Sequence, residues 1–198
     1  GLSIEDATGD PASPLYELPM AVERVRAARQ AIDDSGEDVL LTARAECYHV
    51  GHPQPLRESI RRLQAYVAAG ADVLFAPGVQ TPQVIEMLVA AVAPRPFNLL
   101  VVRDIGLGVE EIAALGVRRI SVGGALPLAA WTGFMHAAQT LRSKGSFSGL
   151  ANLVPYTEIN GLFVSGLPGV VEDACGRSES LAPDDVGDIA DEGVGHRG

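Results

Sequence analysis

The sequence has little cysteine, no excess of basic residues and no long apolar run. Its two cysteines, Cys47 and Cys175, have neither a metal-ligand spacing nor a disulfide framework, so we expect a reducing, cytoplasmic setting. The formal net charge of −10 argues against a nucleic-acid partner, because phosphates need a basic surface. No apolar run reaches the roughly 20 residues of a membrane span, so we expect no membrane partner. Glu5, Asp6 and Asp10 occupy positions where a signal peptide would be basic and then apolar, so we expect none.

Nucleotide-binding loops are also missing. No Gly-x-Gly-x-x-Gly or phosphate-loop pattern follows an expected strand, which argues against a nucleotide ligand. The composition is that of an ordinary globular protein, 47% hydrophobic and 20% charged over 198 residues. From residue 164 onward, acidic residues are set among Gly, Ser and Pro, opposed only by Arg177 and Arg197. We therefore expect a folded domain over residues 1–163 and an acidic, disordered tail over 164–198.

Apolar runs of strand length alternate with segments of helical periodicity. The expected strands cover residues 2–5, 39–43, 72–76, 97–102 and 119–122. The expected helices cover residues 20–33, 56–69, 82–92, 109–115 and 126–144. Thr81 is the expected N-cap of the third helix, with Pro82 at its first position. The alternation predicts an α/β fold with a parallel sheet and right-handed crossovers. The pattern leaves open whether this is a doubly wound sheet or five units of a (β/α)8 barrel.

The clearest functional signal is the position of charged residues at the strand ends. The first strand ends in Glu5 and Asp6, and the second leads into Arg44 and Glu46. We interpret both as buried strands, the second covered on both faces, that deliver these side chains to the carboxyl edge of the sheet. Ligands bind at that edge in α/β folds. Carboxylates on one strand and an arginine on the next suit a metal with an anionic substrate.

Five motifs follow one another in order over the chain. They are Gly1-Leu-Ser-Ile-Glu5-Asp6, Thr42-Ala-Arg44-Ala-Glu46, Ala69-Gly-Ala-Asp72-Val-Leu-Phe75, Pro96-Phe-Asn98 and Leu115-Gly-Val-Arg-Arg119-Ile-Ser121-Val-Gly123. Together they resemble the isocitrate lyase/phosphoenolpyruvate mutase superfamily. The resemblance implies a TIM-type (β/α)8 barrel of which this chain covers the last five βα units. It also implies an enzyme that cleaves or forms a C–C or P–C bond next to a carboxylate, usually with Mg2+.

The resemblance assigns roles to the residues at the strand ends. Glu5 would reach Mg2+ through water, with Asp6 behind it, because Mg2+ prefers oxygen ligands and retains water. Arg44 would grip the carboxylate or phosphoryl group of the substrate with its planar fork. Glu46 would orient Arg44 or touch the surroundings of the metal. Without a ligand, Glu5 would cap its loop, and Arg44 would pair with Glu5 or Glu46.

Residues on the later strands carry further expectations. Asn98, Ser121 and Gly123 are candidate substrate contacts, with close packing as the alternative for Ser121 and Gly123. His49 and His52 are expected to be ordinary surface residues, because no third metal ligand lies near them in the sequence.

The apolar face of the last helix, with Trp131 and Phe134, is expected to pack in the core. The resemblance offers the alternative of a homo-oligomer formed through this helix, because members of the superfamily often exchange it between subunits.

Three functions stay open. The first is a Mg2+-dependent lyase that splits a C–C bond in a small carboxylic acid through an enolate. The second is P–C bond chemistry of the phosphoenolpyruvate mutase or phosphonopyruvate hydrolase type, acting on a phosphonic acid. The loop over residues 7–19 lacks the Lys and Asn of a mutase-type gating loop, which favours the lyase. The third is an inactive remnant that lacks the Asp-x-Asp metal ligands of the superfamily. The Lys-Lys-Cys-Gly-His loop of isocitrate lyases has no counterpart here, which argues against the isocitrate lyase reaction itself.

Overall fold

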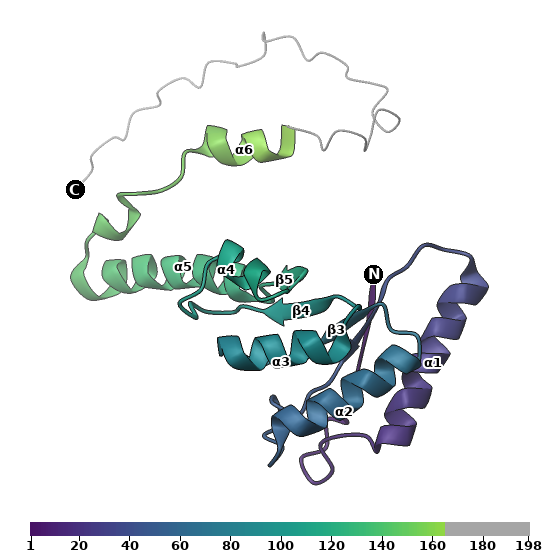
Figure 1. Cartoon of the computed structure of the whole chain (residues 1–198). Coiled ribbons are helices and arrows are strands. Elements are labelled where there is room, and N and C mark those ends of the chain that lie inside the picture. Colours follow the sequence, from purple (N-terminus) through teal and green to yellow (C-terminus); the bar gives the residue numbers. More distant parts are fainter. Residues whose placement is uncertain (165–198) are drawn as a thin grey trace, which may run out of the picture. The chain divides into compact units, whose positions relative to one another are not determined.

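The computed structural model describes residues 1–164, so the predicted acidic tail lies outside the described residues except for Val164. Within them the chain forms a five-stranded parallel sheet whose strands lie side by side in chain order (Figure 1). The strands are β1 (Leu2–Glu5), β2 (Leu41–Arg44), β3 (Val73–Phe75), β4 (Phe97–Leu100) and β5 (Arg119–Ser121). All five coincide with the strands expected from the sequence, most of them with shorter ends.

Helices follow the strands in alternation. They are α1 (Leu18–Ser35), α2 (Pro55–Ala68), α3 (Pro82–Val92), α4 (Val109–Ala114), α5 (Ala125–Lys144), the 3-10 helix η1 (Ser148–Leu150) and α6 (Tyr156–Val164). The first five confirm the expected helices, whereas η1 and α6 are not among the elements expected from the sequence. None of the helices that the structure describes is both long and apolar enough to cross a membrane.

Proline and glycine set the helix ends. Proline stands in the first turn of α1, α2 and α3, where its missing N–H removes no helical hydrogen bond. Gly36 ends α1 in the left-handed conformation, with φ of 70°, and its N–H donates to the Asp33 carbonyl. Thr81 is the residue before α3, as expected, but its side chain makes no capping hydrogen bond.

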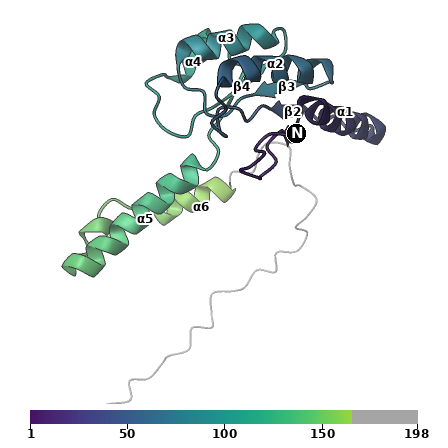
Figure 2. The same ribbon diagram turned by 90° about the horizontal axis from the view of Figure 1, so that it is seen from below.

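The core lies between the sheet and helices α1 to α4, which cover one face of the sheet (Figure 2). On β2, Leu41 and Ala43 are fully buried toward the helices, whereas Thr42 and Arg44 alternate onto the opposite, inner face and are only half-buried. The expectation that this strand is covered on both faces is therefore wrong. The inner face is where the functional side chains lie.

Strand order distinguishes between the two architectures that the sequence left open. A doubly wound sheet reverses its strand order and carries helices on both faces. Here the order is sequential and the helices that pack on the sheet share one face, as in a (β/α)8 barrel. The chain thus has the fold of five consecutive βα units of such a barrel. The described sheet has two edges, β1 and β5.

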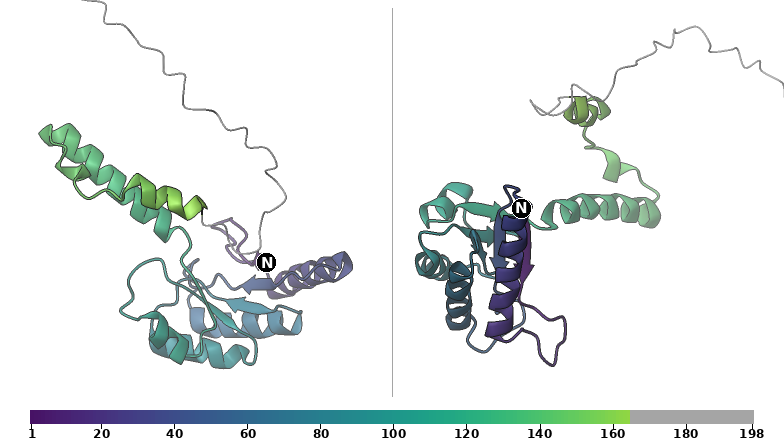
Figure 3. Two further views of the ribbon diagram at one scale, coloured as in Figure 1. Left: turned by 90° about the horizontal axis from the view of Figure 1, so that it is seen from above. Right: turned by 90° about the vertical axis from the view of Figure 1, so that its right-hand side faces the viewer.

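β1 differs from its expected environment. It lies at the edge of the sheet beside α1 (Figure 3, right), and three of its four residues are exposed. The expectation of a buried strand is wrong because β2 is its only neighbour in the described sheet.

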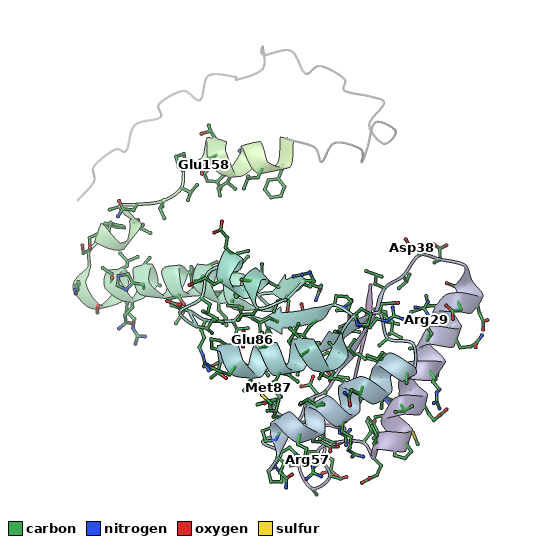
Figure 4. The ribbon with its side chains drawn as sticks, in the orientation of Figure 1. Arg29, Asp38, Arg57, Glu86, Met87 and Glu158 are labelled. Carbon is green, nitrogen blue, oxygen red and sulfur yellow. The ribbon has the colours of Figure 1, made fainter. Side chains whose placement is uncertain are left out.

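An ion pair joins α1 to the sheet. Arg29, labelled in Figure 4, donates from Nη1 to Asp72 Oδ2 at 3.0 Å, and the same oxygen accepts from the N–H of Leu41 at 2.8 Å. Asp72 thus fixes the start of β2 relative to α1. This contact explains why an acid stands immediately before β3.

The described residues belong to two compact units that divide between Gln139 and Thr140, within α5. The sheet lies entirely in the first unit. α5 has no buried residue, and Trp131 and Phe134 are each 60% exposed. The expectation that its apolar face packs in the core is therefore wrong, because α5 contributes no residue to the core. The domain boundary proposed at residue 163 stays a prediction.

Candidate active site

A row of side chains crosses the inner face of the sheet. Strand register places Glu5 opposite Arg44, Arg44 opposite Phe75, Phe75 opposite Asn98, and Asn98 opposite Arg119. Directly paired residues of parallel strands point to the same face. The row therefore brings together residues from all five strands, and three of them are predicted site residues.

Arg44 stands between two carboxylates. Its Nη2 and Nε lie 2.7 and 2.8 Å from Oε1 of Glu46, and its Nη1 lies 3.3 Å from Oε2 of Glu5. The guanidinium also lies over the ring of Phe75, 5.0 Å from its centre, a cation–π contact. These contacts realise both ion pairs that the sequence offered as alternatives. They hold the guanidinium in place at the end of β2.

Glu46 is almost fully buried, with 2% of its side chain exposed. Burial raises the pKa of Glu46 above its ordinary value, and the positive charge of Arg44 opposes that rise. The short bonds from Arg44 are those of an ion pair, so we take Glu46 as ionised at neutral pH. In the structure Glu46 contacts Arg44, which agrees with one of its two expected roles; the role itself stays a prediction.

Asp6 points into the protein and organises the loops after β1 and β2. Its side chain is 2% exposed. Oδ1 accepts from the backbone N–H of Glu46 at 2.8 Å, and Oδ2 accepts from Arg62 Nη1 at 3.0 Å and from the Tyr66 hydroxyl. Arg62 also donates to the carbonyl of Tyr16, which ties the loop after β1 to α2. The sequence predicted a supporting position for Asp6 but not Arg62 and Tyr66.

The strand-end residues border a cleft of about 490 Å3. It is lined by Glu5, Ala7, Gly9, Asp10, Pro11, Pro14, Arg44, Glu46, His49 and Val50. Glu5, Arg44 and Glu46, three of the predicted residues, therefore meet at one cavity. His49 is exposed, as predicted, but it also lines this cleft, and Asp10 and His49 are residues that the sequence did not mark as part of a site.

The described residues do not make a complete metal site. No group of three or more His, Cys, Asp or Glu side chains within the described residues could hold a metal ion. Glu5 is half exposed and already contacts Arg44, and both oxygens of Asp6 are occupied. Of these acids, Glu5 alone has a carboxylate free enough to face a metal, and one carboxylate does not form a Mg2+ site.

Asn98 and Ser121 lie side by side on β4 and β5, and Gly123 follows the end of β5. Asn98 is fully buried, and its Nδ2 donates to Ser121 Oγ at 2.9 Å. Ser121 and Gly123 line a second hollow of about 590 Å3 on the inner face, which Arg44 also lines. Arg44 is therefore the residue that the cleft and the hollow share. The predicted roles of all these residues toward a substrate or metal stay predictions.

Comparison with known proteins gives one consistent family. The family model described as phosphoenolpyruvate phosphomutase matches residues 1–142. An uncharacterized protein of Mycobacterium tuberculosis is 30% identical over 164 residues, which are 83% of this chain and 58% of that protein.

Solved structures give the same result. A protein of Burkholderia cenocepacia described as of lyase/mutase type is 42% identical, with a TM-score of 0.77 over 83% of this chain and 59% of that one. A 2,3-dimethylmalate lyase is 26% identical, with a TM-score of 0.69 over 82% of this chain and 58% of the lyase. The chain thus spans less than two thirds of the length of each of these relatives.

Proposed function

This chain belongs to the phosphoenolpyruvate phosphomutase family, and on that premise we propose that the protein is a lyase that cleaves a C–C bond in a small carboxylic acid. The superfamily holds lyases and mutases, and its 2,3-dimethylmalate lyase shares the fold of this chain. The observation that carries the proposal is the placement of Arg44. An arginine oriented by a buried acid, at the end of a strand and facing a cleft, is suited to bind a carboxylate.

Arg44 and Glu46 each have a role in the proposed cleavage of the C–C bond. In the cleavage of a 2-hydroxy acid, the hydroxyl loses its proton and becomes a carbonyl while the neighbouring C–C bond breaks. The electron pair of that bond passes to the departing acid as an enolate, which then takes up a proton. Arg44 stabilises the negative charge as it develops, and Glu46 holds the guanidinium so that no reorientation is needed at that moment.

Dependence on Mg2+ is part of the proposal. Superfamily members generally depend on a metal, and Glu5 is the side chain of this chain that would contribute an oxygen through water. The remaining ligands would have to come from outside the described residues, because these hold no cluster of three suitable side chains.

P–C bond chemistry on a phosphonic acid is the second candidate. It is favoured by the description of the matching family model and by a similar phosphonomutase-type protein of Burkholderia cenocepacia. We favour the C–C lyase because a mutase-type gating loop would carry Lys and Asn. Residues 7–19, several of which line the cleft, contain neither. An inactive remnant is the third candidate, since the described donors do not complete a metal site.

The test is an activity assay on the protein expressed from its complete gene. We expect 2-alkylmalate-type acids to release pyruvate, oxaloacetate or glyoxylate, and EDTA to abolish the release. Arg44→Ala should lower kcat/KM by about 100-fold or more, because it removes the guanidinium that would hold the acid group of the substrate. Arg26→Ala is the control, because Arg26 is exposed on α1. Turnover that survives EDTA, or an unchanged rate in Arg44→Ala, would contradict the mechanism.

A homo-oligomer formed through α5 is a further part of the proposal. Leu128, Trp131 and Met135 are each at least 60% exposed, and so large an apolar surface is unusual on a monomer. Sedimentation velocity should detect an oligomer, and Trp131→Ser should shift it toward the monomer. A monodisperse monomer at micromolar concentration would contradict this part.

The cytoplasmic location stays a prediction.

A further inference from the structure

The backbone of Glu46 is held at both of its polar groups. Its N–H donates to Asp6 Oδ1 at 2.8 Å, and its carbonyl oxygen accepts from the N–H of Val50 at 3.0 Å. The side chain of Glu46 is buried, and its Oε1 accepts two bonds from Arg44. A rotation of this backbone would carry the carboxylate away from Arg44. The direction of the Arg44 guanidinium therefore depends on the bond between Asp6 and Glu46.

Two side chains of α2 fix the direction of the Asp6 carboxylate. Arg62 Nη1 donates to Asp6 Oδ2 at 3.0 Å, and the hydroxyl of Tyr66 donates to the same oxygen. Arg62 and Tyr66 are four residues apart on α2, so they lie on the same face of the helix. Because these two donors occupy Oδ2, Oδ1 is left to accept from the N–H of Glu46.

Arg62 is itself held from several sides. Its Nε donates to Glu58 Oε1 at 2.7 Å, and its Nη1 also donates to the carbonyl oxygen of Tyr16 at 3.0 Å. The N–H of Tyr16 in turn donates to the carbonyl oxygen of Asp6 at 2.9 Å. The Arg62 side chain is 6% exposed. A buried planar guanidinium with partners in several directions has little freedom to rotate, so it can serve as a fixed reference for Asp6.

Arg62 acts on the cleft only through other residues. Arg62 and Tyr66 are buried and are not part of the cleft lining. A line of contacts instead runs from α2 through Asp6 and Glu46 to the guanidinium at the cleft. This line lies between β1, β2 and α2, and β1 and β2 are paired neighbours in the sheet.

We propose that Arg62 is a positioning residue for the reaction at the cleft, and that it sets the direction of the Arg44 guanidinium without touching the substrate. The proposal rests on the proposed function, because that function assigns an acid group of the substrate to Arg44. A guanidinium that is already oriented binds an anion more tightly than one that must first be ordered, because the ordering is complete before binding. Loss of Arg62 frees Asp6 to turn, and the orientation of Glu46 and Arg44 is lost with it.

The test measures binding of malonate by calorimetric titration into the protein expressed from its complete gene. Malonate has two carboxylates but no hydroxyl that could become a carbonyl, so the proposed cleavage cannot occur and binding is measured without turnover. Arg62→Met removes the guanidinium and keeps an apolar side chain on α2. It should raise the Kd of malonate about tenfold, which corresponds to the loss of about one hydrogen bond to a charged group.

Arg61→Met is the matched control. Arg61 precedes Arg62 and carries the same charge, but it is exposed, and within the described part of the chain its ion pair is with Glu58 and not with Asp6. Arg61→Met should leave the Kd of malonate within about twofold of that of the unmodified protein. Equal weakening by the two methionine variants would mean that the lost charge on α2 explains the effect, and the positioning role would be refuted.

A double-mutant cycle tests whether Arg62 acts through Arg44. Arg44→Lys keeps the positive charge but lacks the planar fork that has to be oriented. In this background Arg62→Met should change the Kd of malonate by less than about twofold, because no guanidinium is left to position. A purely structural role of Arg62 would weaken binding by the same factor in both backgrounds, and that result would refute the proposal.

Arg62→Lys replaces Arg62→Met if the methionine variant fails to fold. One ammonium group keeps a charge beside Asp6 but lacks the fork that also contacts Glu58 and Tyr16, so Kd should rise by less than tenfold, and an unchanged Kd would refute the proposal. Absence of malonate binding to the unmodified protein would refute it as well. Malonate binding that depends on Arg62 stands even if lyase activity is absent. Lyase activity with equal kcat/KM in Arg61→Met and Arg62→Met would refute the positioning role and leave the proposed function in place.

Discussion

Replacing Asp6 by asparagine removes the charge at the centre of the buried cluster that joins the loops after β1 and β2. Asp6 accepts hydrogen bonds from three donors, the N–H of Glu46, the guanidinium of Arg62 and the hydroxyl of Tyr66. An asparagine of the same size offers one carbonyl oxygen and one NH2 group in place of two accepting oxygens. At least one of the three donors must then face another donor or lose its partner.

The magnitude follows from burial. The side chains of Asp6 and Arg62 are 2% and 6% exposed, so solvent screens their ion pair little. Removing one partner of a buried pair costs about 3–5 kcal/mol, because the other charge stays buried. Arg62 keeps Glu58, whose Oε1 lies 2.7 Å from its Nε, so we expect the lower end, about 3 kcal/mol. That is a large part of the 5–15 kcal/mol by which domains are usually stable, as an order of magnitude.

Urea denaturation followed by circular dichroism measures this loss as a lower midpoint at unchanged slope. The matched control is Glu5→Gln, which removes the same charge from the preceding residue. The Glu5 side chain is 50% exposed, so its ion pair with Arg44 should contribute less than about 1 kcal/mol. If Asp6→Asn costs no more than Glu5→Gln, the cluster does not hold the two loops together, and the reasoning from burial fails.

Three further predictions concern stability. Tyr66→Phe should cost about 1.5 kcal/mol in the same urea titration, because it deletes one bond to a charged acceptor that keeps its other donors. Hydrogen bonds from Arg61 and Arg62 lower the pKa of Glu58 to about 2. Glu58 therefore stabilises the fold fully above the unfolded pKa of about 4.3, and the stability difference from Glu58→Gln should shrink as the pH falls toward 2. Gly70→Ala should lower the melting temperature more than Gly9→Ala. Both glycines have positive φ, but a Cβ at Gly70 would lie 2.8 Å from Arg29 Cγ, whereas Gly9 has open space.

Much of the fold was open to prediction because its local signals agree with one another. Apolar runs of strand length, proline in the first turn of α2 and α3, and glycine after α1 each report on neighbouring residues only. The environment of β1 could not be read in this way. Its apolar run resembles a central strand, and its exposure follows from having one neighbour in the described sheet. α5 poses the same difficulty, because an apolar helix face does not reveal what covers it.

In the candidate site, residues next to strand ends could be predicted from the sequence, whereas residues within a helix could not. Glu5, Arg44 and Glu46 stand next to strand ends, so the parallel pattern alone placed them at one edge. Arg62 and Tyr66 escaped prediction because they lie within the amphipathic pattern of α2, 56 and 60 residues after Asp6 in the chain. A buried arginine is recognisable only when its partner is known.

The fixed position of Arg44 depends on which of the nearby acids holds it. A free guanidinium among Glu5, Asp10 and Glu46 would turn toward whichever acid was nearest, and the hydrogen bonds that Arg44 donates to Glu46 remove that freedom. Strand ends in the sequence place these side chains at one edge of the sheet, but the sequence does not say which acid holds the arginine, because that choice depends on the burial of Glu46.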